Sequence, residues 1–179
     1  AVSRVRAAGI ETMMPVAFGE SRRLPWRGPS FILTAEVGGK RLEDYVRLLC
    51  GKFREKRGII AALADCARRL HRAGLNHRDL YLSHVFLRAS GPALIDLQRV
   101  ESNARGTNRW VVKDLAALNY SSPASVVSRT DRMRFLLRYL GVETLDADGK
   151  AFLKRIHRKT ERIRRHDLKK RNHGGHREL

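Results

Sequence analysis

The sequence has few cysteines and no long apolar run, and each shortage argues against a class of protein. Its two cysteines, Cys50 and Cys66, form no Cys-x-x-Cys pair. This argues against a disulfide framework or a zinc site and predicts a protein of the reducing cytosol. No stretch of the sequence approaches the roughly 20 consecutive apolar residues that a membrane-spanning helix needs.

Acidic residues are also scarce relative to basic ones. The chain has 179 residues, with 37 Lys+Arg against 18 Asp+Glu, for a net charge of +19. Such an excess predicts an anionic partner: nucleic acid, an acidic membrane surface, or a phosphorylated or carboxylated substrate. The length is typical of one domain, and the 42% hydrophobic content is sufficient for a core.

Hydrophobic periodicity predicts a mixture of helices and strands. Residues 13–18 and 31–35 are expected to form a hairpin around a loop over residues 21–29, which is rich in Pro, Gly and Arg. Two further short strands are expected around the Ser-Gly-Pro turn at residues 90–92. Helical spacing of apolar residues predicts helices over residues 56–73, 111–120 and 131–140.

The most informative motif is His77-Arg78-Asp79-Leu80. It matches the first four positions of the kinase catalytic loop, H-R-D-L-x-x-x-N, in which the Asp lies near the attacking hydroxyl group and the Asn binds a metal ion. The Asn position holds His84. A neutral imidazole nitrogen can still bind a metal, although magnesium prefers oxygen ligands.

A second carboxylate, Asp96, follows a hydrophobic strand 17 residues after Asp79. A hairpin between the two would return Asp96 to a position beside Asp79. The alternative is that both residues only cap turns at strand ends. The succession of amphipathic helix, glycine, catalytic-loop motif, hairpin and Leu-Ile-Asp favours phosphoryl transfer, which needs positioned carboxylates and metal ions.

With these motifs, the sequence resembles the lipopolysaccharide core heptose kinases, a branch of the protein-kinase-like superfamily. His84 in place of Asn, and Tyr81 where protein kinases often carry Lys, are typical of that branch and argue against a protein kinase. The matching segments are residues 9–13, 16–20, 30–34, 42–45, 75–79, 94–97, 109–110 and 113–115.

The resemblance implies an α+β protein-kinase-like fold. Residues 1–36 would be the end of the small lobe, residues 37–150 the helical large lobe with the catalytic loop, and residues 151–179 a basic C-terminal helix and tail. The implied reaction is transfer of the γ-phosphoryl group of ATP, with Mg²⁺, to a heptose hydroxyl group in the lipopolysaccharide inner core.

The resemblance also implies roles for individual residues. Asp79 would be the catalytic carboxylate, and Asp96 and His84 would hold magnesium. The adenine ring would meet the backbone of the hinge residues Thr34, Glu36 and Val37.

Three further residues are expected to support the catalytic loop. Asp114 occupies the position at which kinase-like folds use a buried Asp to brace that loop, although an exposed helix residue is the alternative. His77 and Arg78 belong to the loop itself, and a structural role is expected for both. For Trp110 we expect simple packing rather than contact with a ligand.

The sequence departs from the kinase pattern in its first residues. It contains no glycine-rich loop, no Val-Ala-x-Lys strand and no helix glutamate to pair with such a lysine. Kinase chemistry needs the Lys–Glu pair together with the metal-binding Asp. We therefore expect this chain on its own to be nearly inactive, and the full-length gene product to be active unless the gene itself is truncated.

The basic segment over residues 151–179 has eleven Lys or Arg residues against three acidic residues. A solvated helix face is one interpretation. The other is docking on lipid A-linked acidic sugars or on the anionic inner face of the inner membrane, where the protein would be cytoplasmic and peripheral.

Two other classes of protein compete with the kinase hypothesis. A nucleic-acid-binding module would suit the charge. However, aromatic residues make up only 7% of the chain and none interrupts the basic run after residue 152, which argues against base stacking. The other competitor is a degenerate pseudokinase that acts as a scaffold.

Overall fold

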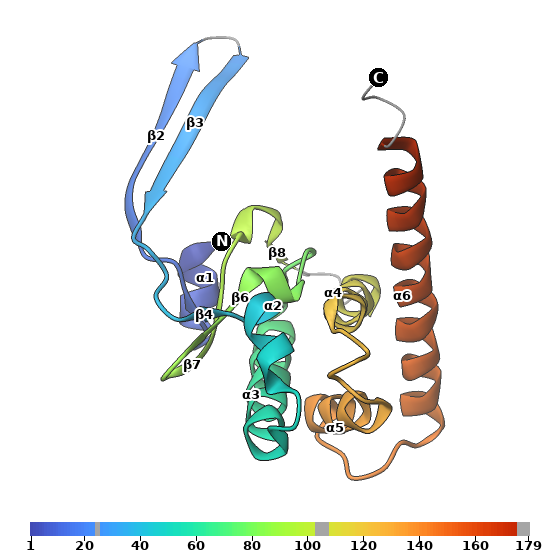
Figure 1. Cartoon of the computed structure of the whole chain (residues 1–179). Helices are drawn as coiled ribbons and strands as arrows, with labels where there is room; N and C mark the ends of the chain where they lie inside the picture. Colours follow the sequence, from blue (N-terminus) through green and yellow to red (C-terminus); the bar gives the residue numbers. More distant parts are fainter. Residues whose placement is uncertain (24–25, 103–107, 175–179) are drawn as a thin grey trace.

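The computed structural model describes residues 1–23, 26–102 and 108–174, which combine short strands with longer helices (Figure 1). In chain order the elements are α1 (Val2–Ala7), β1 (Glu11–Thr12), β2 (Pro15–Arg23), β3 (Trp26–Thr34), β4 (Lys40–Arg41), α2 (Leu42–Tyr45), the 3-10 helix η1 (Val46–Leu49), α3 (Phe53–Arg72), β5 (Leu75–Asn76), η2 (Leu82–His84), β6 (Val85–Arg88), β7 (Gly91–Leu94), η3 (Leu97–Arg99), β8 (Glu101–Ser102), α4 (Asn108–Ser121), α5 (Arg129–Leu140) and α6 (Ala147–Gly174).

A four-stranded sheet places the segment that carries Asp96. Its strand order is β1-β7-β6-β4, and the antiparallel β6–β7 hairpin confirms the two strands that the sequence predicts around residues 90–92. Val85 faces Leu94 in that hairpin, and both are buried. The pairing therefore returns the end of β7, where Asp96 follows, to the start of β6 beside the catalytic loop.

The β2–β3 hairpin is longer than the sequence predicts. The expected loop over residues 21–29 is wrong, because β2 continues to Arg23 and β3 begins at Trp26. A shift in register after Glu20 accommodates the extra residues, and Gly28 lies so close to Ser21 that an added Cβ would come within 2.3 Å of the Ser21 carbonyl oxygen. Glycine is thus a strand residue here because the two backbones approach too closely for a side chain. Figure 1 shows the hairpin extending away from the helices.

The longer helices pack in pairs. The predicted helices over residues 56–73, 111–120 and 131–140 are confirmed as α3, α4 and α5. α3 packs against α5, and α4 packs against α6. α6 continues to Gly174, well beyond the point near Asp167 at which the regular pattern of the sequence fades. None of the helices in the described part of the chain has both the length and the apolar character needed to cross a bilayer.

A buried ion pair joins α3 to α5. The Lys56 ammonium group lies 2.9 Å from the Asp131 carboxylate and donates a hydrogen bond to the Val126 carbonyl oxygen at 2.8 Å. Asp131 also completes a capping box with Ser128 at the start of α5. Burial alone would raise the pKa of Asp131, but the hydrogen bonds from Lys56 and Ser128 lower it to about 2.

Candidate active site

The catalytic loop is fastened to α4 by a buried carboxylate. Asp114 is fully buried, and its two oxygens accept hydrogen bonds from the backbone N–H groups of His77 and Arg78, both at 2.7 Å. Arg78 has φ +70°, a left-handed conformation that a non-glycine residue adopts only when its surroundings enforce it. The two hydrogen bonds to Asp114 hold the backbone of Arg78 in this conformation. The burial of Asp114 also excludes the alternative that it is an exposed helix residue.

His77 connects the catalytic loop to the strand before Asp96. Its Nε2 lies 2.9 Å from the carbonyl oxygen of Ile95, so this nitrogen carries the proton and donates it to the carbonyl. Burial lowers the pKa of His77, which favours the neutral ring. A neutral His77 thus ties the segment that carries Asp79 to the segment that carries Asp96.

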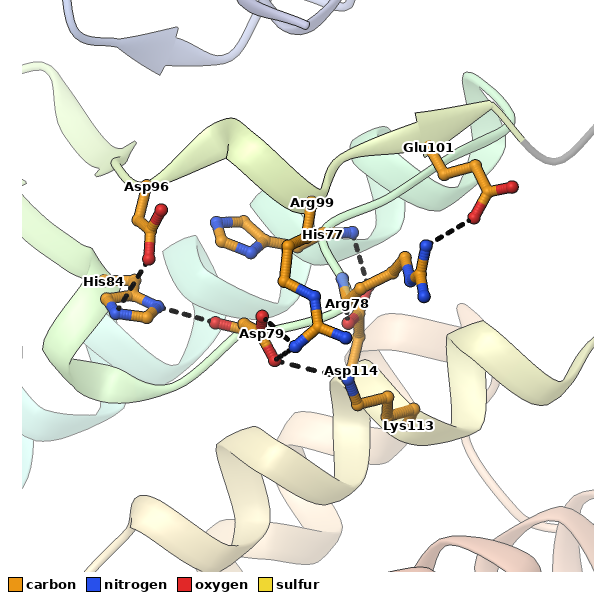
Figure 2. A network of polar contacts seen from close by, with 9 residues as sticks. All are labelled: His77, Arg78, Asp79, His84, Asp96, Arg99, Glu101, Lys113 and Asp114. Carbon is orange, nitrogen blue, oxygen red and sulfur yellow. Dashed lines mark hydrogen bonds and ion pairs between the residues drawn. The ribbon is translucent and has the colours of Figure 1, made fainter. Parts of the chain in front are cut away.

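Two cations meet the side chain of Asp79 (Figure 2). The Arg99 guanidinium lies 2.9 Å from Oδ2, and the Lys113 ammonium lies 3.2 Å from Oδ1. Neither cation is assigned a role by the motifs of the sequence. The only indication in the sequence is that both cations lie close to predicted site residues. Arg99 follows Asp96 by three residues, and Lys113 directly precedes Asp114. Together they hold the Asp79 carboxylate in one orientation.

His84 and Asp96 lie on the other side of Asp79 (Figure 2). His84 Nδ1 donates its proton to the backbone carbonyl oxygen of Asp79 at 2.7 Å, which leaves the lone pair of a neutral ring on Nε2. That nitrogen lies 3.5 Å from Asp96 Oδ2, and Asp96 has a left-handed φ of +54°. One nitrogen and one carboxylate therefore point to the same place, as two ligands of a magnesium ion would. Within the described residues no cluster of three or more potential metal ligands occurs.

The Arg78 side chain points away from Asp79. Its guanidinium pairs with Glu101 at 2.8 Å and lies over the Trp110 ring, 4.2 Å from the ring centre. The ring of Trp110 also faces Arg109, again at 4.2 Å. Trp110 therefore packs between two guanidinium groups.

The three predicted hinge residues lie at the end of β3 and in the segment that follows it. Thr34 ends β3, and Glu36 and Val37 follow in the segment that leads to β4. That segment is connected to the catalytic loop at its far end, where Arg41 donates a hydrogen bond from Nε to the Ser83 carbonyl oxygen at 3.1 Å. The structure thus brings together Asp79, His84, Asp96 and Asp114 (Figure 2).

Comparison with known proteins assigns this arrangement to a family. The profile of the family described as "Lipopolysaccharide kinase (Kdo/WaaP) family" matches residues 1–139, so the chain belongs to that family. The chain is 34% identical to the lipopolysaccharide core heptose(I) kinase WaaP of Pseudomonas aeruginosa, over 91% of this chain and 66% of that protein. It is 33% identical to the WaaP of Escherichia coli, over 95% of this chain and 69% of that protein.

A solved structure supports the fold. The structure described as "WaaP in complex with acyl carrier protein" matches with a TM-score of 0.75 and 33% identity, over 90% of this chain and 73% of that one. The predicted resemblance and the kinase-like α+β class are therefore confirmed. The chain spans between 58% and 69% of the length of the three curated relatives it matches.

Proposed function

We propose that the protein to which this chain belongs transfers the γ-phosphoryl group of ATP to a heptose hydroxyl group in the lipopolysaccharide inner core. The names of its relatives support the substrate class. The observation that carries the proposal is the placement of two carboxylates on either side of one loop, with Asp79 fixed by two cations and Asp96 beside His84 Nε2.

In this proposal Asp79 orients the attacking hydroxyl group and accepts its proton. Asp96 and His84 would hold Mg²⁺, which when bound neutralises charge on the phosphates. Arg99 and Lys113 keep the Asp79 carboxylate pointed at the acceptor, and as positioned cations they favour the extra negative charge of the transition state. The backbone of Thr34, Glu36 and Val37 would meet the adenine ring.

The test is phosphoryl transfer by the full-length gene product. Asp79→Asn should lower kcat by at least about 100-fold, the usual scale for the loss of a general base. The matched control is Asp65→Asn, which removes an exposed carboxylate that pairs with Arg138 and should leave kcat within about twofold. Wild-type turnover by Asp79→Asn would refute the role of Asp79.

The metal role has its own test. His84→Ala should raise the Mg²⁺ concentration needed for half-maximal activity by about tenfold, in line with the usual effect of altering a metal site. Asp96→Asn should abolish activity at every Mg²⁺ concentration. An unchanged Mg²⁺ dependence in both variants would contradict their assignment as ligands.

We further propose that the protein is cytoplasmic and binds peripherally to the inner face of the inner membrane. The support is the basic surface of α6, because each Lys or Arg near an anionic bilayer contributes roughly 1 kcal/mol. Sedimentation with vesicles should show binding to phosphatidylglycerol that weakens with salt. Equal binding to neutral phosphatidylcholine vesicles would contradict it.

The solved neighbour supports one more partner. That structure contains WaaP together with an acyl carrier protein. We propose that this chain also binds an acyl carrier protein, which gel filtration of the two purified proteins would detect as a shared peak. Separate elution at micromolar concentrations would argue against the complex.

A further inference from the structure

A basic groove lies between α4 and α6, which run side by side (Figure 1). It has a volume of about 460 Å³. We call it the α4–α6 groove, and its lining consists of Arg109, Trp110, Val112 and Lys113 from α4 with Arg155, Arg158, Lys159 and Arg162 from α6.

The cations that α6 contributes have no acidic partners in the described part of the chain. The neighbouring acidic side chains are used elsewhere, since Glu161 pairs with Arg164 at 2.7 Å and Asp167 pairs with Arg171 at 3.0 Å. Like charges three and four residues apart on a helix repel one another. An arrangement of this kind lowers the stability of the helix, and a bound anion would offset that loss.

Lys159 lies close to other cations of the groove. Its pKa is lowered by burial and then by the charges of Arg162, Lys113 and Arg109, which belong to both walls of the groove. The cations of α4 and those of α6 therefore repel one another across the groove. A bound anion would relieve the repulsion across the groove.

The groove leads to the catalytic carboxylate. Lys113 lines the groove and also lies 3.2 Å from Asp79 Oδ1. In Figure 2, His84 and Asp96 lie on the opposite side of Asp79 from Lys113. In the proposed function the nucleotide phosphates and the metal lie on the side of Asp96, which leaves the side of the groove for the acceptor hydroxyl group.

We propose that the α4–α6 groove binds an anionic group, a phosphate or a carboxylate, carried by the sugar acceptor close to the heptose that is phosphorylated. The inference rests on the proposed function. The small volume of the groove suits one charged substituent rather than the continuous backbone of a nucleic acid. Its single aromatic ring, Trp110, already packs between two guanidinium groups and offers no series of stacking platforms.

The experiment compares two double variants of the full-length protein. Arg158→Glu with Arg162→Glu reverses two cations of the groove. Lys154→Glu with Arg165→Glu reverses two exposed cations of the same helix that do not line it, so the total change in charge is equal. Arg158→Gln with Arg162→Gln provides a milder groove variant, and a thermal melt verifies that each variant is folded.

The probe is a deacylated core oligosaccharide, measured by isothermal titration calorimetry. Three forms are used: one with its phosphates and carboxylates intact, one dephosphorylated and one with its carboxylates reduced. The groove variant should bind the intact form at least tenfold more weakly than the wild type, which corresponds to about 1.4 kcal/mol. The control variant should stay within about threefold.

The modified oligosaccharides identify the anion. If one modified form binds the wild type more weakly than the intact form does, and the groove variant causes no further loss for that form, then the group removed from it is the anion that the groove binds. Equal affinity of the wild type for all three forms, with no effect of either variant, would overturn the inference and leave the proposed function intact. No binding of any form to the wild type would overturn both.

A titration with duplex DNA tests the remaining alternative, which is that the groove binds nucleic acid. If the groove variant lost affinity for DNA and kept its affinity for the intact oligosaccharide, the groove would be a nucleic-acid site and the inference would be wrong. DNA binding that falls equally in the groove and control variants reflects total charge. That result, together with selective loss of the oligosaccharide, supports the inference.

Discussion

Replacing Asp114 by Ala should destabilise the protein strongly, although Asp114 touches no substrate in the proposed mechanism. The carboxylate accepts two backbone hydrogen bonds at 2.7 Å, from His77 and Arg78, and it is fully buried. His71 also faces it, with Nε2 at 3.3 Å. Asp114→Ala would leave the two backbone donors without their acceptor in a place that water does not reach.

The expected cost follows from those two donors. Each buried group left without a hydrogen bond costs about 1–3 kcal/mol, so the loss of two should lower the free energy of unfolding by about 2–6 kcal/mol. A domain of this size is stable by roughly 5–15 kcal/mol, and the variant should therefore still fold. Asp114→Asn keeps one acceptor oxygen and should lose about half as much.

Urea unfolding, followed by far-ultraviolet circular dichroism, measures the change. With a slope of about 2 kcal/mol per M, the middle of the usual range for urea, the midpoint for Asp114→Ala should fall by about 1–3 M. The control is Asp65→Ala, which breaks an exposed ion pair with Arg138 and should cost less than about 1 kcal/mol. A loss below about 1 kcal/mol in Asp114→Ala would refute the account of Asp114 as the brace of the catalytic loop.

Three other measurements test features of the fold. Because the pKa of Asp131 is lowered to about 2 by its hydrogen bonds, its contribution to stability is present above about pH 4 and is lost as the pH falls toward 2. Asp131→Asn should remove that part of the pH dependence of urea unfolding, and an unaltered profile would contradict it. Burial raises the pKa of the Cys66 thiol to about 11, so Ellman's reagent at pH 8 should label only the exposed Cys50 in the native protein and both thiols in urea. Gly39→Ala should lower the free energy of unfolding by about 1–3 kcal/mol, because Gly39 has φ +113° and an added Cβ would come within 2.4 Å of the carbonyl oxygen of the facing strand. A stable Gly39→Ala variant would show that this backbone can relax.

Local patterns in the sequence predicted much of the fold. Three features are determined by residues that are close together in the sequence. They are the apolar stripe of α3, the hairpin between residues 85 and 94, and the glycine that ends α5. The proximity of Asp79 and Asp96 followed from the length of that hairpin. Such features are predictable because the interactions that fix them are short in sequence.

The partners of Asp79 could not be predicted in the same way. Arg99 and Lys113 reach it across 20 and 34 residues of sequence, and neither spacing corresponds to a period of helix or strand. The length of the β2–β3 hairpin depended on a change of register that allows Gly28 to approach Ser21. The α4–α6 groove depends on the packing of two helices, which determines which cations of a uniformly basic segment meet.

The contacts that assemble the catalytic loop also define an order in which the protein can be built. Those between the loop and its partners span 5, 20, 34 and 37 residues, and all are complete once α4 has been synthesised. The groove needs α6, the last helix described. Since short loops close at lower entropic cost than long ones, we expect the carboxylates to be in place on the growing polypeptide before the surface for the acceptor exists. The α4–α6 groove is thus the last part of this region to form during synthesis.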